Sequence, residues 1–119
     1  MFIIFMAFIK KKLAVYPWPV EVSKPSQTNV GEFETTTFTV KFIRLKTSEL
    51  VKFEEDAVGL EPVEMLKMIV AGWTDYTYED GKDIPFSDKE LEEIAEDADM
   101  VAAISDGYKK FYGNAQVKN

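Results

Sequence analysis

The chain has 119 residues, 46% of them hydrophobic, which suits one domain with a modest core and excludes a disordered tail. The formal net charge of −7 argues against nucleic acid as the main partner, because duplex binding needs a basic face that displaces counterions. The absence of cysteine and histidine excludes disulfides, thiolate zinc sites and nucleophiles activated by histidine.

The N-terminal segment is apolar from Met1 to Ile9 and is followed by three lysines. A secretory signal has its positive charge before the apolar run, and nine residues are too few to span a bilayer. No membrane partner is therefore predicted. Our hypothesis is that Met6 is the natural start and that residues 1–5 lie upstream of it. The alternative is a strand that packs on a neighbour.

Residues 10–45 form the predicted β region. Residues 13–22 are rich in β-formers but contain Pro17 and Pro19, so we expect an edge strand or extended arm. A polar loop over 23–31 leads to the clearest strand, residues 32–45. Its alternation places three apolar side chains on one face: Phe38, Val40 and Phe42. The pattern predicts an antiparallel hairpin or small sheet.

Residues 47–114 are expected to be mainly helical, within one domain over 1–119 and an α+β fold of about four helical segments. Thr47 or Ser48 offers an N-cap for a short helix that Gly59 ends. Pro62 suits the first turn of the next helix, which we expect to be buried and to end near Gly72.

An extended turn segment over 73–86 precedes the last two predicted helices. Ser87 and Glu90 have the spacing of a capping box, and Phe86 with Leu91 that of a hydrophobic staple. The last helix begins after Asp97 or Asp99 and ends near Gly113-Asn114. Gly107 is unfavourable inside a helix and indicates a close helix–helix approach.

The acidic residues do not form a recognisable catalytic or metal site. Asp75, Glu79, Asp80 and Asp83 surround Gly81, but an EF-hand loop starting at Asp75 would need glycine where Asp80 stands. A tight polar turn with Asp80-Gly81 at its tip is the simpler interpretation. The other paired carboxylates read as solvated helix faces: Glu54, Glu55, Glu92, Glu93 and Glu96. We predict no catalytic, cofactor-binding or metal-binding residue.

Partner binding is the function that the remaining residues favour. Tryptophan and tyrosine carry much of the energy of interfaces, and methionine adapts to varied partners. Trp18, between two prolines, is the best candidate for contact with another subunit, and the strand edge beside it could accept a partner strand. Lysines at 10–12 and acids over 88–99 could favour head-to-tail association, although solvation explains them more simply. The predicted partner-binding residues are Trp18, Trp73, Tyr76, Tyr78, Met65, Met68 and Ile69, although core packing is the simpler explanation for most of the aromatic residues and for the apolar stripe of Met65, Met68 and Ile69.

Three stretches, in order, resemble the tail assembly chaperones of long-tailed phages and prophages. The first is M-A-F-I-K-K-K-L-A-V-Y-P-W-P-V-E-V near the start, and the second is F-T-V-K-F-I-R-L-K-T-S-E-L in the middle. The third is G-W-T-D-Y-T-Y-E-D-G-K-D-I-P-F-S-D-K-E-L, followed by A-A-I-S-D-G-Y-K-K-F. The family-like opening begins at Met6.

This resemblance implies a non-enzymatic protein of the infected host's cytoplasm that is absent from the mature virion. Its partners would be the tape measure protein, which it keeps soluble, the tail tube protein that assembles around it, and a frameshifted longer form of itself. Self-association into a homo-oligomer is expected. The alternatives are a structural tail or connector subunit and, less readily, a small carboxylate-based enzyme.

Overall fold

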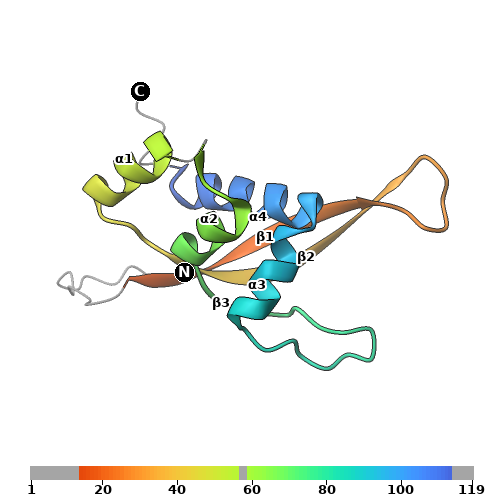
Figure 1. Ribbon diagram of the computed structural model, residues 1–119. Helices are drawn as coiled ribbons and strands as arrows, with labels where there is room; N and C mark the ends of the chain where they lie inside the picture. Colours follow the sequence, from red (N-terminus) through yellow and green to blue (C-terminus); the bar gives the residue numbers. More distant parts are fainter. Residues whose placement is uncertain (1–13, 57–58, 114–119) are drawn as a thin grey trace, which may run out of the picture.

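The computed structural model describes residues 14–56 and 59–113 and has the α+β fold that the sequence predicts. A three-stranded antiparallel sheet has the order β1-β2-β3, and its helices lie against it (Figure 1). The elements are β1 (Val15–Pro25), β2 (Phe33–Ile43), α1 (Thr47–Asp56), α2 (Pro62–Ile69), β3 (Val70–Thr74), α3 (Asp88–Ala95) and α4 (Ala98–Phe111). The predictions on residues 1–13, Met6 among them, and on Asn114 lie outside the described residues.

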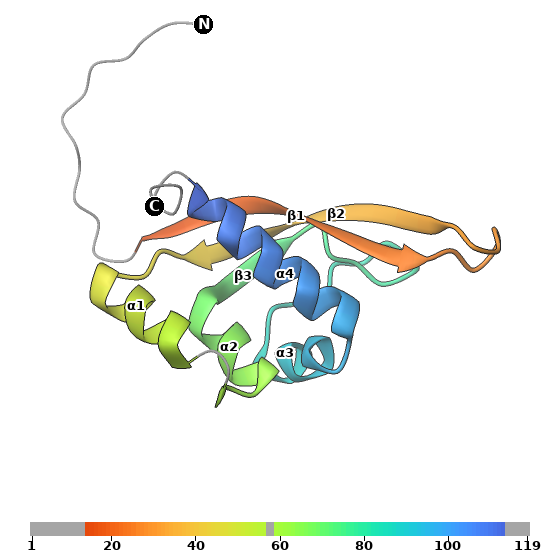
Figure 2. The ribbon, with the colours of Figure 1, turned by 90° about the horizontal axis from the view of Figure 1, so that it is seen from above.

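The β1–β2 hairpin is the longest part of the sheet, and the core is built against one of its faces. The two strands pair from Val15 with Ile43 to Pro25 with Phe33, and the predicted buried face of β2 is confirmed. Even-numbered side chains of both strands point towards α4, which lies along the hairpin in Figure 2. Strand alternation places the odd-numbered residues of β1 and β2 on the opposite face of the hairpin, and most of these side chains are exposed.

The outer edge of β1 is poorly suited to pairing with a further strand. Arg44 N–H donates to Ala14 O at 2.8 Å, so even-numbered residues of β1 bond to β2 and odd-numbered ones direct their backbone outwards. Pro17, Pro19 and Pro25 occupy three of these outward positions, and proline has no N–H to donate. The edge strand is confirmed, but its expected use as a partner-strand acceptor is not supported.

Strand β3 was not predicted. The expected helix up to Gly72 is wrong in its last part, because α2 ends at Ile69 and Val70–Thr74 pair with β2. An apolar run that is hydrophobic on every side fits a buried strand as well as a buried helix. Here the pairing of Val40 with Trp73 and of Lys41 with Gly72 decides for the strand.

The helix starts follow local capping. Ser87 Oγ accepts from Glu90 N–H at 3.0 Å and Asp97 Oδ1 from Asp99 N–H at 3.1 Å, so both predicted caps are confirmed. The Glu90 carboxylate does not complete the predicted capping box and instead accepts from a tyrosine. Thr47 already lies in α1, so the prediction of an N-cap at Thr47 or Ser48 is wrong by a residue or two.

Gly107 marks a close approach of α4 to the sheet, not to another helix as predicted. A Cβ atom at Gly107 would lie 3.0 Å from Val20 Cγ2 and 3.8 Å from the Phe42 ring. Glycine therefore lets the helix rest directly on β1 and β2.

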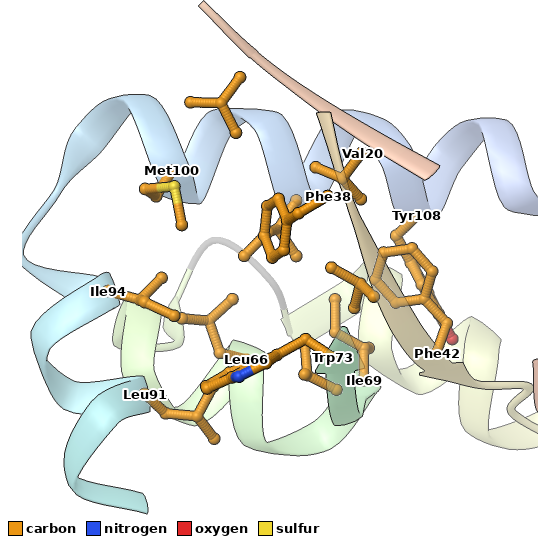
Figure 3. Packing of buried hydrophobic residues seen from close by; sticks show 14 of the residues in the cluster. Val20, Phe38, Phe42, Leu66, Ile69, Trp73, Leu91, Ile94, Met100 and Tyr108 are labelled. Atoms are coloured by element: carbon orange, nitrogen blue, oxygen red, sulfur yellow. The ribbon is translucent and has the colours of Figure 1, made fainter. Parts of the chain in front are cut away.

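The core lies between the sheet and α2, α3 and α4, whose apolar side chains converge in Figure 3. Seven side chains in it are almost completely buried: Val20, Val40, Phe42, Leu66, Ile69, Leu91 and Ile104. Within residues 14–56 and 59–113, no helix has the length and apolar character needed to cross a membrane.

Candidate functional site

One open hollow lies where β1 begins and α4 ends. We call it the aromatic cleft, and its walls are Ala14, Tyr16, Pro17, Trp18, Arg44 and Phe111. The Phe111 ring centroid lies 6.0 Å from that of Tyr16 and 5.8 Å from that of Trp18. Tyr16 remains 41% exposed and Trp18 is half-buried. Trp18 is thus partly accessible, as the prediction that it contacts a partner requires.

Arg44 and two tyrosines fix the end of α4 against the end of β2. Arg44 donates to Phe111 O at 3.0 Å, and its guanidinium lies 3.9 Å from the Tyr112 ring centroid. Tyr108 donates to Ile43 O at 2.9 Å, and burial raises the pKa of the Tyr108 hydroxyl. A cation beside the C-terminal carbonyls also favours the helix dipole. The cleft wall is therefore rigidly held.

A second group of aromatic residues is formed within the 73–86 segment by Trp73, Tyr76 and Phe86. Trp73 is only 8% exposed, and its indole N–H donates to Ile84 O at 2.8 Å. Its ring packs edge-on against Phe86 at 4.9 Å and Tyr76 at 5.3 Å between centroids. Trp73 thus anchors this segment to the core and offers little surface to a partner.

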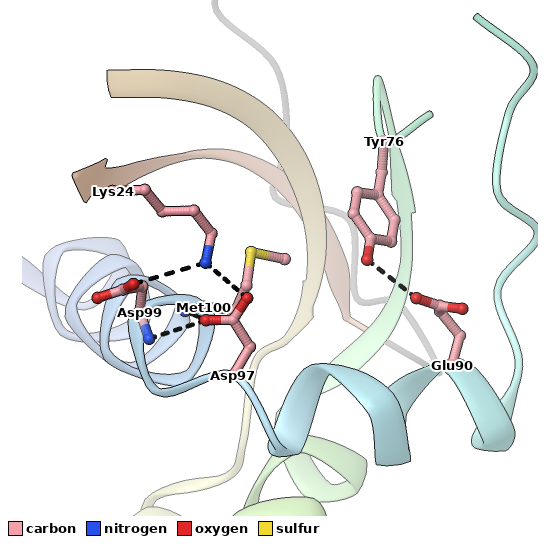
Figure 4. A network of polar contacts seen from close by, with 6 residues as sticks. All are labelled: Lys24, Tyr76, Glu90, Asp97, Asp99 and Met100. Carbon is pink, nitrogen blue, oxygen red and sulfur yellow. Dashed lines mark hydrogen bonds and ion pairs between the residues drawn. The ribbon is translucent and has the colours of Figure 1, made fainter. Parts of the chain in front are cut away.

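Tyr76 links the segment to α3. Its hydroxyl donates to the Glu90 carboxylate at 2.9 Å, as Figure 4 shows. Burial, followed by this hydrogen bond, raises the pKa of the Tyr76 hydroxyl. The bond uses the carboxylate that the capping box would have used, so the sequence motif serves a tertiary contact.

The loop between Tyr76 and Ile84 is the tight polar turn that the sequence predicts. Tyr78 N–H donates to Lys82 O at 2.9 Å, and Gly81 adopts a φ of 89° that favours glycine. Asp80 Oδ1 accepts from Lys82 N–H at 2.9 Å. Tyr78 is 54% exposed on this loop. In the described ranges, no three acidic side chains gather closely enough to hold a metal ion.

A polar contact fixes the hairpin to the start of α4. Lys24 Nζ lies 2.7 Å from Asp97 Oδ2 and 3.5 Å from Asp99 Oδ2 (Figure 4). The hydrogen bond from Lys24 lowers the pKa of the Asp97 carboxyl, against a smaller opposing effect of burial. All three side chains are partly solvated, so the contact orients the hairpin more than it stabilises the fold.

The predicted apolar stripe of α2 is only partly accessible. Ile69 is buried and Met65 is half-buried, with its sulfur 3.6 Å from Ser105 Oγ. Met68 is 38% exposed and lines a groove between α1 and α2. We call this the methionine groove; its walls are Leu45, Glu49, Lys52, Phe53, Leu60 and Met68.

The predicted partner-binding residues therefore do not form one site. Trp18 belongs to the aromatic cleft, Met68 to the methionine groove and Tyr78 to an exposed turn, whereas Trp73 and Ile69 are buried. The sequence reasoning did not select Tyr16 or Arg44. The two-residue spacing of Tyr16 and Trp18 on a strand was the signal that could have paired them.

Comparison with known proteins gives no further assignment: no family model, no curated protein and no solved structure matches the chain.

Proposed function

We propose that the protein is a tail assembly chaperone of a long-tailed phage or prophage. It binds the tape measure protein, keeps it soluble and promotes assembly of the tail tube around it. It acts in the host cytoplasm and leaves before the virion is complete. The observation that carries this proposal is the ordered resemblance of three stretches of the sequence to that family.

The positions of the resembling residues strengthen the argument. Trp73 anchors the 73–86 segment, Gly81 permits its turn, and Ser87 caps the following helix. These residues specify a local structure together, so a protein that shares their order is expected to share this substructure. In this third stretch the resemblance therefore involves residues with linked structural roles.

The methionine groove suits a helical partner segment. Its apolar floor comes from Leu45, Phe53, Leu60 and Met68, while Glu49 and Lys52 stand at its rim. An amphipathic helix can place its apolar face in such a groove, and methionine adapts to varied side chains. The net charge of −7 keeps a complex with an apolar partner in solution.

The test is co-expression with the tape measure gene of the same cluster. We expect this protein to raise the soluble fraction of the tape measure protein. Met68→Asp should weaken the binding of the tape measure protein at least about tenfold and so lower that soluble fraction. Val51→Asp is the matched control, since Val51 is exposed on α1 but does not line the groove. A tape measure protein that is equally insoluble with and without this chain would contradict the proposal. Persistence of the chain in purified virions would favour a structural subunit.

A further inference from the structure

The two ends of the β1–β2 hairpin carry different surfaces. The turn end extends beyond the helices, whereas the start of β1 lies beside the end of α4 (Figures 1 and 2). The strand from Tyr16 to Pro25 is roughly 30 Å long at about 3.3 Å per residue. The ends are therefore too far apart to meet within one molecule.

The turn end is apolar and acidic. We call Val30, Glu32, Phe33 and Glu34 the hairpin tip. Val30 is fully exposed and Phe33 is 69% exposed, and neither belongs to the core. Glu32 and Glu34 lie on either side of Phe33 and are both exposed, although Glu34 Oε2 also accepts a hydrogen bond from Ser26 Oγ at 2.7 Å. Two large apolar side chains at the end of a projecting hairpin are costly to leave in water and indicate a contact surface.

The aromatic cleft at the other end is apolar and basic. Tyr16, Trp18 and Phe111 supply its apolar wall, and Arg44 lies in it. Lys46 lies in the segment after β2, and Lys109 and Lys110 lie in the last turn of α4. All three are exposed, with Lys110 Nζ 3.2 Å from Asp106 Oδ2. The cleft thus complements the tip in both polarity and charge.

We propose that copies of this chain associate head to tail, with the hairpin tip of one copy in the aromatic cleft of the next. Val30 and Phe33 contact the aromatic wall, and Glu32 and Glu34 face the basic residues around it. Two tips would repel each other through their glutamates, which disfavours a symmetric tip-to-tip contact. The prolines on the β1 edge leave side chains, not strand pairing, to make the contact.

This geometry predicts a heterologous interface, in which each copy uses two different surfaces. A copy with a damaged tip keeps its cleft, and a copy with a damaged cleft keeps its tip. Two such variants should therefore form a pair that cannot grow, although neither associates alone. A symmetric interface built from one self-complementary surface would not behave in this way.

The experiment is sedimentation velocity over a range of protein concentrations. The tip variant is Val30→Ser with Phe33→Ser, the cleft variant is Tyr16→Glu, and Tyr78→Ser is a control in which an exposed aromatic residue elsewhere is removed. We expect concentration-dependent growth for the wild type and the control. Each variant alone should associate at least about tenfold more weakly, and an equimolar mixture should stop at dimers.

Circular dichroism and thermal unfolding establish that each variant is folded, and Lys46→Glu replaces Tyr16→Glu if the latter is not. Wild-type protein that stays monomeric would overturn the proposal. So would a tip or cleft variant that associates like the wild type, or a mixture of the two that stays monomeric. The assay contains no tape measure protein, and neither the tip nor the cleft shares a lining residue with the methionine groove. Its failure would therefore leave the chaperone proposal standing.

Discussion

Replacing Gly107 with alanine should destabilise the fold although it improves the helix. Alanine in place of glycine inside a helix gains about 0.5–1 kcal/mol. The new methyl group would lie 3.0 Å from Val20 Cγ2, and Val20 is itself almost completely buried with a stiff β-branched side chain. Overpacking of this kind costs about 1–3 kcal/mol. The difference between the two ranges runs from about 0 to 2.5 kcal/mol, and we expect a net loss near its middle, about 1 kcal/mol, in the free energy of unfolding.

Urea unfolding followed by circular dichroism measures this loss, provided that the transition is two-state. Gly59→Ala is the control, because a Cβ there meets no atom within 4 Å and the residue has no positive φ. A double variant, Val20→Ala with Gly107→Ala, isolates the clash, because the new methyl group fills space that Val20 vacates. Its loss in the free energy of unfolding should be at least about 1 kcal/mol smaller than the sum of the losses of the two single variants. A Gly107→Ala protein as stable as the wild type, or additive costs, would refute the proposed contact.

Two further predictions concern polar contacts. The pKa of Asp97 is lowered in the fold below its ordinary value of 3.8, so the contribution of its contact with Lys24 is complete above that value and is lost as the pH falls through the folded pKa. Asp97→Asn keeps the helix cap and should flatten the decline in the free energy of unfolding below about pH 4, by less than about 1 kcal/mol for so exposed a pair. Urea titrations at several pH values measure this decline, and an unchanged pH profile would contradict the prediction. Trp73→Phe removes the indole N–H that donates to Ile84 O, and it should lower the free energy of unfolding by about 1–3 kcal/mol in urea titrations. An unaltered urea midpoint would show that this hydrogen bond does not secure the 73–86 segment.

Local signals predicted much of the fold because the residues concerned act on their own neighbours. The alternation around Val40 gives β2, Pro62 opens α2, and Ser87 and Asp97 cap α3 and α4. Strand β3 escaped prediction because its existence depends on a partner about thirty residues earlier. Val70 to Trp73 are apolar without a clear period, and only their pairing with β2 distinguishes a strand from the end of a helix.

The candidate site was harder to predict because residue type does not determine exposure. Trp18 and Trp73 look equally suited to a partner in the sequence, yet one borders an open cleft and the other is enclosed by Tyr76, Ile84 and Phe86. Which side a tryptophan faces depends on the element that covers it. For Trp18 that element is distant in sequence, as its contact with Phe111 illustrates, whereas Trp73 is covered by the loop that follows it.

The first strand separates two properties that are often treated as one. Its even-numbered side chains, such as Val20 and Val22, supply cohesion to the folded molecule. Its odd-numbered prolines contribute little to that cohesion but deny a template to any other chain that approaches the edge. Conformational stability and resistance to aggregation are therefore encoded in alternate residues of β1, and selection or engineering can adjust one without disturbing the other.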